Sequence, residues 1–283
     1  MNMFRLSMAL LLLASCDRSR TPPVRAAALD FAAYGDCRSQ TDVHRKIARA
    51  IAAAGARYVL VSGDLVDAPD DAEAWARFRE AANDLLKNPY YCAPGDHDTG
   101  AKNLYQKEFG LDRLYYDRLQ EDCHLFMLDS CGSFDDAAQL AWLEKTAEAS
   151  TARHKIAVFH HPPFGIHPRR TQQTETIRGK IHPLLVKLRF CGAICGHQHA
   201  FYTTRRDGVR YVVTAGGGAS LYSQDPSLGQ PGDQSRKFFH FVGFRNAGSR
   251  LDARVYDVDG IEDGSLAFTF CEHEPGGPPK KKE

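Results

Sequence analysis

The sequence predicts an α/β fold in which two β-sheets pack together and helices cover the outside. Apolar stretches of strand length alternate with helix-like segments through the first two thirds of the 283 residues. This βαβαβ order is typical of a parallel sheet, because parallel strands need a crossover connection. The last third changes to closely spaced strands with turn signals, which indicates antiparallel pairing.

The first half supplies three predicted strands and two predicted helices. Apolar residues at helical spacing follow Ser39, a candidate N-cap with Asp42 three positions on, and Gly55 ends that helix. The neighbouring apolar runs are short and continuous, as expected for strands buried on both faces. We therefore predict strands at 29–34, 58–62 and 90–93, with helices between Ser39 and Gly55 and at 71–86.

The second half continues the alternation and then becomes β-rich. His182-Pro183 lies inside a helical stretch and predicts a kink or a break. Asp207-Gly208 predicts the turn of a hairpin. The predicted elements are strands at 123–128, 155–159 and 191–195, helices at 137–150 and 175–188, and then strands at 200–205, 210–214, 238–244, 251–256 and 266–271.

Five short motifs carry acids or histidines, and each follows an apolar run where a strand would stop. Open α/β sheets build their sites at the carboxyl ends of strands, so five such loops indicate one assembled metal centre. A single Asp in this position is more often a helix cap or turn former, and the metal centre is therefore inferred from all five together. The motifs are Gly35-Asp36-Cys37-Arg38, Gly63-Asp64-Leu65-Val66-Asp67, Gly95-Asp96-His97-Asp98, His160-His161-Pro162 and Gly196-His197-Gln198-His199.

The order of these motifs resembles that of the calcineurin-like metallophosphoesterases, which include the purple acid phosphatases. The resemblance covers about residues 30–222 and implies a four-layer α/β/β/α sandwich of two mixed β-sheets with outer helices. Two positions depart from the family pattern. Arg38 stands where the first motif usually has His, and Asp96 stands where the third usually has Asn. Asp67 occupies the place of the metal-bound Tyr of purple phosphatases, which argues against a tyrosinate-ligated iron site.

The resemblance implies a centre of two divalent or trivalent transition-metal ions. Asp64 would bridge them. Mixed carboxylate and imidazole ligation suits Fe, Zn, Mn or Co better than Mg or Ca, which prefer oxygen ligands alone. The first ion would be held by Asp36 and His199, and the second by Asp96, His160 and His197.

The same resemblance implies a hydrolytic mechanism. A hydroxide bridging the ions would attack phosphorus, since metal binding lowers the pKa of water to about 7 at zinc-type centres. His97 would act as general acid and protonate the leaving alkoxide. Asp98, its neighbour, would orient the His97 imidazole and keep it cationic.

Arg38 cannot be a ligand, because a guanidinium has no lone pair to donate. We expect His44, in the first turn of the following helix, to supply the missing imidazole, and Arg38 to hold a phosphate oxygen. The alternative is that His44 is an ordinary helical residue and Arg38 a surface or salt-bridged side chain. His161 would point away from His160 and is interpreted as a packing or surface residue. His167, Arg169 and Arg170 lie in the loop after His160 and are interpreted as a solvated charge cluster, with contact to substrate phosphate as the alternative.

These features predict a metal-dependent hydrolase acting on a small phosphoester, as a phosphomonoesterase or a phosphodiesterase. The alternative is a degenerate, catalytically impaired member that works as a binding lipoprotein, since Arg38 and Asp96 depart from the pattern. Lys and Arg number 36 and Asp and Glu 35, and the resulting formal net charge of +1 is too small to attract nucleic acid. We expect a monomer.

The first residues predict export. Arg5 precedes a short apolar run that is too short to span a membrane as a mature helix. Leu13-Ala14-Ser15-Cys16 resembles the lipobox of bacterial lipoproteins, which implies a signal peptide at 1–15, lipidation of Cys16 and a periplasm-facing, lipid-anchored protein. A chance Cys after an ordinary secretory signal is the alternative. We predict a tether at 16–27, a single domain at 28–272 and a disordered tail at 273–283.

Seven cysteines remain after Cys16, an odd number without Cys-x-x-Cys spacing. Cys191 and Cys195 lie in one predicted strand, and four extended residues span roughly 13 Å, too far for a bridge. We therefore expect mostly buried free thiols, with at most one or two bridges whose partners the sequence does not assign. His124, His154 and His182 have no motif context.

Overall fold

The computed structural model describes residues 28–274 and contains two mixed β-sheets. The six-stranded sheet has the order β13-β12-β11-β1-β2-β3. Strands β1, β2 and β3 pair in parallel, whereas β1 pairs antiparallel with β11, which starts an antiparallel meander. The strands are β1 (Phe31–Tyr34), β2 (Tyr58–Val61), β3 (Tyr90–Cys92), β11 (His240–Asn246), β12 (Arg250–Asp257) and β13 (Phe268–Glu272).

The seven-stranded sheet has the order β10-β8-β9-β7-β6-β5-β4. Its centre is parallel, from β5 through β6 and β7 to β9, and its edges are antiparallel. The strands are β4 (Tyr116–Gln120), β5 (Cys123–Met127), β6 (His154–Val158), β7 (Gly192–Cys195), β8 (Phe201–Arg206), β9 (Val209–Thr214) and β10 (Gln234–Arg236).

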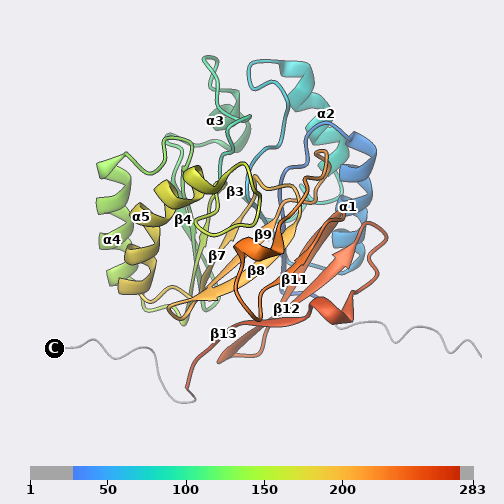
Figure 1. The fold of residues 1–283 in the computed structure, drawn as a ribbon. Coiled ribbons are helices and arrows are strands. Elements are labelled where there is room, and N and C mark those ends of the chain that lie inside the picture. Colours follow the sequence, from blue (N-terminus) through green and yellow to red (C-terminus); the bar gives the residue numbers. More distant parts are fainter. Residues whose placement is uncertain (1–27, 275–283) are drawn as a thin grey trace, which may run out of the picture.

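Helices cover the outer face of each sheet (Figure 1). α1 (Thr41–Ala53) and α2 (Ala72–Ala82) share an apolar cluster with the six-stranded sheet, joined by the short α3 (Leu104–Phe109). α4 (Ala137–Ala149) and α5 (Thr171–Lys187) share another with the seven-stranded sheet. A third cluster joins the inner faces of the two sheets. The predicted four-layer α/β/β/α sandwich is confirmed.

The sequence missed several elements and misplaced a few boundaries. α3, β4, β10 and two 3-10 turns, Pro226–Leu228 and Gly264–Leu266, were not predicted. α1 begins at Thr41 without a side-chain cap, because Ser39 has a left-handed φ of 72° and donates its hydroxyl to Asp67. α5 begins four residues earlier than predicted and continues through Pro183 without a break.

The predicted signal peptide (1–15), the lipidated Cys16 and the tether (16–27) lie outside the described residues, as does the tail from 275 onward. Two residues assigned to the tail are described, and His273 contacts both Cys191 and Cys271. The predicted start of the tail at 273 is therefore corrected. Within residues 28–274, no helix is long and apolar enough to cross a bilayer.

Candidate metal centre

The carboxyl ends of five strands place the motif side chains together. Asp36 follows β1, Asp64 follows β2, Asp96 follows β3, His160 follows β6, and the last motif follows β7. Parallel strands end at a common edge, so their loops meet there. Two groups of potential ligand atoms result, each with all its atoms within 4.8 Å of one another: Asp36, Asp64 and His199, and Asp96, His160, His161 and His197.

Close contacts hold the two groups together. In the first, His199 Nε2 lies 3.2 Å from Asp36 Oδ1. In the second, Asp96 Oδ1 lies 2.9 Å from His160 Nε2 and 3.2 Å from His197 Nδ1. Asp64 connects them, because its Oδ1 lies 3.4 Å from His160 Nε2. A carboxylate between two ligand groups is what a bridging position requires.

The backbone at this edge is strained. Four of the predicted ligands have a positive φ: Asp36 (56°), Asp64 (58°), His197 (69°) and His199 (34°). Non-glycine residues rarely adopt this region, and strain of this kind concentrates at functional sites. Gly196 allows the close approach, since a Cβ there would lie 2.5 Å from Asp36 Oδ2. Close packing of the loops therefore explains why glycine precedes the Asp or His in these motifs.

Hydrogen bonds on the far side of two imidazoles set their tautomers. His160 Nδ1 faces the carbonyl oxygen of Ser62 at 2.8 Å, and His199 Nδ1 faces that of Ser220 at 2.7 Å. A carbonyl oxygen only accepts, so each Nδ1 donates its hydrogen, and the neutral ring carries its lone pair on Nε2. Both Nε2 atoms point at the carboxylates. Metal-ligating histidines are oriented by such second contacts, and the donor set therefore fits metal ions.

The electrostatics of the cluster favour a cation. Burial lowers the pKa of His160, but Asp64, Asp96 and Asp36 outweigh this effect and raise that pKa to about 10. Burial raises the pKa of Asp96, but hydrogen bonds from His160 and His197 hold it far below its usual range. The carboxylates that stabilise the positive charge of the fully buried His160 would stabilise a metal ion there equally well.

A family model described as calcineurin-like phosphoesterase matches residues 29–201. The chain belongs to this family. Among curated proteins it is 31% identical over 177 residues to a probable glycerophosphodiester phosphodiesterase GpdQ of Arcobacter nitrofigilis, covering 56% of this chain and 61% of that protein. It is 25% identical over 212 residues to tartrate-resistant acid phosphatase type 5 of Oryctolagus cuniculus, covering 61% and 65% respectively. The chain therefore matches less than two thirds of either relative.

Solved structures share the fold of this calcineurin-like phosphoesterase. The purple acid phosphatase PPD1 of yellow lupin (Lupinus luteus) superposes with a TM-score of 0.72 at 16% identity, over 87% of this chain and 54% of that one. GAP50, the anchor in the inner membrane complex of Plasmodium, superposes with a TM-score of 0.68 at 14% identity, over 86% and 89%. At these identities, the likeness extends to the fold alone.

Two residues proposed for the centre have other partners in this family member. The buried His44 hydrogen-bonds Tyr34 Oη through Nε2 at 2.9 Å and stacks on Phe78. It points into the apolar layer beneath α1, so its assignment as a ligand is corrected. Arg38 donates to Asp64 Oδ2 at 3.1 Å and to Asp67 Oδ1 at 2.9 Å. Arg38 is therefore salt-bridged in this structure, and its phosphate-binding role stays a prediction.

Asp98 also has a different role from the one expected. Its buried carboxylate accepts hydrogen bonds from the backbone N–H groups of Asp64, Leu65 and Gly95 at 2.7–2.8 Å. These bonds hold the Asp64 loop against the Asp96 loop, so the orienting role towards His97 is corrected. The His97 side chain is 37% exposed, with Nε2 3.9 Å from Asp96 Oδ2.

Sequence reasoning missed two basic residues at the centre. His161 Nε2 lies 3.6 Å from Asp96 Oδ1, and its ring centroid lies 4.3 Å from that of His197. The chain leaves β6 and bends at this point, so the alternation of a strand no longer applies. Arg170 contacts His197 Nε2 and covers the Tyr222 ring. It stands next to α5, whose early start also brings Gln173 Oε1 to 2.9 Å from the same nitrogen.

Proposed function

We propose that this protein hydrolyses a small phosphoester with the help of two transition-metal ions at the centre. The observation that supports this proposal most strongly is Asp64, which lies between two groups of ligand residues supplied by five loops. Asp36, Asp64 and His199 would hold one ion, and Asp64, Asp96, His160 and His197 the other. Ions of this kind supply a hydroxide at neutral pH and offset charge on phosphoryl oxygens.

The residues around the ligands would carry the remaining steps. The partial exposure of His97 beside Asp96 supports a role for it as proton donor at the open side of the cluster. Asp98 fixes the Asp64 loop through backbone amides. Arg170 stands at the outer edge of His197, where a guanidinium would attract an anionic substrate. Fe, Zn, Mn and Co all suit this donor set.

The substrate class follows from the chemistry and the relatives together. A dimetal centre serves both monoesters and diesters, and the two curated relatives are named as a probable phosphodiesterase and an acid phosphatase. The test uses purified protein stripped of metal and reloaded with each of the four metals. Turnover of p-nitrophenyl phosphate is compared with that of its bis ester, alongside metal content. We expect about two ions per chain at this centre and turnover of at least one ester.

The rival function is a binding lipoprotein with an impaired site. The Arg38–Asp64 ion pair favours it, because a guanidinium occupies one oxygen of the proposed bridging carboxylate. Metal content that Asp64→Asn leaves unchanged, with no turnover of either ester under any metal, would support this rival and remove the hydrolase proposal. Bound metal without turnover would support metal binding alone.

We also propose that the protein is anchored to a bacterial membrane through lipidated Cys16 and faces the periplasm. The lipobox-like Leu13-Ala14-Ser15-Cys16 supports this proposal, since several acyl chains on one residue anchor stably. Fractionation of cells expressing wild type and Cys16→Ala tests it. Wild type should be in the membrane fraction and the variant in the soluble fraction, and an equal distribution would contradict the anchor.

A further inference from the structure

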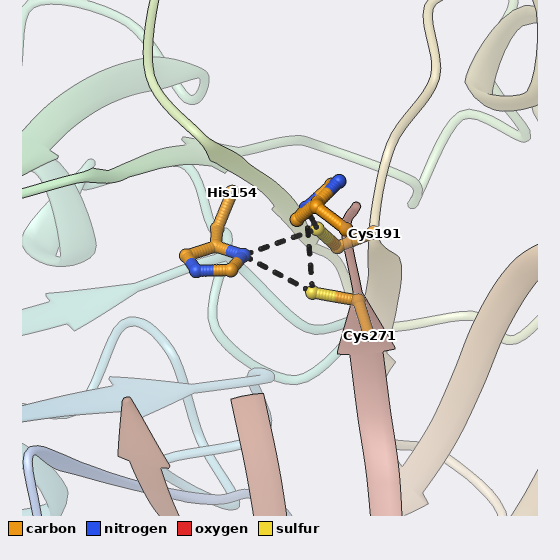
Figure 2. Close-up of side chains that lie close together, drawn as sticks. His154, Cys191 and Cys271 are labelled. Carbon is orange, nitrogen blue, oxygen red and sulfur yellow. Dashed lines mark hydrogen bonds between the residues drawn. The ribbon is translucent and has the colours of Figure 1, made fainter. Parts of the chain in front are cut away.

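A second group of metal-ligand residue types lies at the other end of the same strands. His154 begins β6, Cys191 precedes β7, Cys271 lies in β13, and His273 follows β13. Their ligand atoms all lie within 4.8 Å of one another. Figure 2 shows the side chains of His154, Cys191 and Cys271 converging. The group joins the seven-stranded sheet to the six-stranded sheet.

The distances match a tetrahedral site. With Zn–S near 2.3 Å and Zn–N near 2.05 Å, tetrahedral ligands place sulfur and nitrogen about 3.5 Å apart. His154 Nδ1 lies 3.1 Å from Cys271 Sγ and 3.6 Å from Cys191 Sγ. His273 Nε2 lies 3.3 Å from Cys191 Sγ and 3.8 Å from Cys271 Sγ. Each imidazole therefore approaches both sulfur atoms at the separation that a shared ion requires.

The tautomer of His154 is set for ligation. His154 Nε2 faces the carbonyl oxygen of Gly248 at 2.8 Å, so this nitrogen donates a hydrogen. The lone pair of the neutral ring is then on Nδ1, the atom that faces both sulfurs. Asp122 Oδ2 lies 3.9 Å from the same Nε2. A carbonyl or carboxylate behind a ligating imidazole is the usual support for a zinc ligand.

The charge balance of the group also suits a divalent ion. His154 is fully buried, and Cys191 and Cys271 are each 4% exposed. Two thiolates and two neutral imidazoles around a divalent cation carry no net charge, which keeps the cost of burial small.

We propose that His154, Cys191, Cys271 and His273 form a closed, tetrahedral Cys₂His₂ site for Zn²⁺ or a similar thiophilic divalent ion. Four protein ligands leave no coordination position for water or substrate, which is the pattern of a structural site. The ion would fasten β6 and β7 to β13 and hold the two sheets together at the end opposite the dinuclear centre. The site is independent of the proposed hydrolysis.

A disulfide between Cys191 and Cys271 is the competing use of these thiols, particularly in an exported protein. The seven cysteines among the described residues are free. A disulfide would also leave the two imidazole nitrogens facing sulfur atoms that have no hydrogen to donate. The experiment therefore includes a count of free thiols.

Cobalt substitution distinguishes this site from the dinuclear centre. The centre has only nitrogen and oxygen donors, whereas Co²⁺ bound by thiolates gives sulfur-to-metal charge-transfer absorption in the near ultraviolet. We expect the whole protein, refolded or expressed with Co²⁺, to show this band with about one thiolate-bound ion per chain. Absence of the band in protein that binds cobalt, or loss of two free thiols without metal, would overturn the proposal.

Two variants assign the band to these residues. Cys271→Ser and His273→Ala should each abolish or shift it, and the half-buried His273 is the milder change for folding. Cys92→Ala, a buried thiol in β3, is the matched control and should leave the band unchanged. A band that persists unaltered in both variants, or that disappears in the control alone, would place the sulfur-bound metal elsewhere.

Discussion

β6 and β7 each contribute to two clusters of metal-ligand residues, one at either end. β6 begins with His154 and is followed by His160, while β7 is preceded by Cys191 and followed by His197. At about 3.3 Å per residue, the six steps from His154 to His160 separate the clusters by roughly 20 Å. The same pair of strands thus carries two clusters of different side-chain chemistry.

The two clusters differ in donors, backbone and access. The carboxyl-end cluster is rich in carboxylates, rests on loops with positive φ and is partly open, with the Asp96 side chain 43% exposed. The amino-end cluster has two thiols and two imidazoles at strand ends, and three of the four residues are buried. Open, strained oxygen-rich sites suit catalysis, and closed thiol sites suit structural metals. The expected catalytic and structural roles of the two clusters therefore follow from the surroundings of the ligands more than from the number of ligands.

The largest expected effect is a double dissociation between the clusters. Asp64→Asn should reduce ester turnover by more than about 10³-fold, because a neutral amide replaces the carboxylate that would bridge the two ions. Asn is chosen since it tolerates the φ of 58° at this position. Cys271→Ser should keep turnover within about two-fold, since sites this far apart act independently.

Steady-state kinetics and the cobalt thiolate band together measure this dissociation. Asp64→Asn should keep the band, and Cys271→Ser should lose it. If either variant removes both turnover and the band, the two clusters are one cooperative unit and the comparison fails.

His97 tests whether the open cluster contains a proton donor that is not a ligand. We expect His97→Gln to lower turnover of poor leaving groups by about 10²–10⁴-fold, the usual range for a positioned acid. The dinuclear metal content should stay unchanged. Activated esters need little protonation, so their loss should be much smaller. Equal losses across a series of aryl leaving groups would assign His97 another role.

His161 lies at the edge of the same cluster, where it could support a metal ion or contact the substrate. His161→Asn should preserve the contact that Nδ1 makes with Ser130 Oγ at 3.0 Å, while removing the Nε2 atom that faces Asp96. If His161 supports the second ion, metal affinity should fall by about 10–100-fold. Isothermal titration of stripped protein with Mn²⁺ or Zn²⁺ measures it. Unchanged affinity with a raised Michaelis constant would instead place His161 on the substrate side.

The sequence predicted the carboxyl-end cluster because its motifs combine two independent signals. Asp36, Asp64 and Asp96 each follow a strand of the six-stranded sheet, and parallel strands end at one edge. The strand order therefore predicted that these three loops meet, and the resemblance of the five motifs to a known family added the histidines of the other sheet. The role of Asp98 was missed, because only packing shows that its carboxylate faces the amides of the Asp64 loop.

The amino-end cluster could not be read from the sequence. His154 and Cys191 stand at the starts of neighbouring strands, but Cys271 comes from the other sheet, 80 residues after Cys191. Their proximity depends on how the two sheets align face to face. No local pattern encodes that alignment. The same limit applies to Arg170, which reaches His197 only because α5 begins early.

His44 provides the smallest and most specific test, because it is a buried histidine that belongs to neither cluster. Burial, together with the smaller effect of the nearby Arg45, lowers its pKa to about 3. The folded protein thus keeps His44 neutral while the unfolded chain protonates it near pH 6.5. Below that value the unfolded state binds the extra proton, so stability falls as the pH falls towards 3.

His44→Gln removes this titration and keeps a polar atom for Tyr34 Oη. Urea unfolding of metal-stripped wild type and variant between pH 7 and 4 should show a shallower loss in the variant, by up to about 1.4 kcal/mol per pH unit. His161 and His240, whose pKa values burial lowers to about 2 and about 4, titrate in both proteins and cancel in the difference. If the stability profiles of wild type and variant run parallel, His44 is protonated in the folded state. Its side chain would then have to reach the polar residues at the carboxyl edge of the sheet.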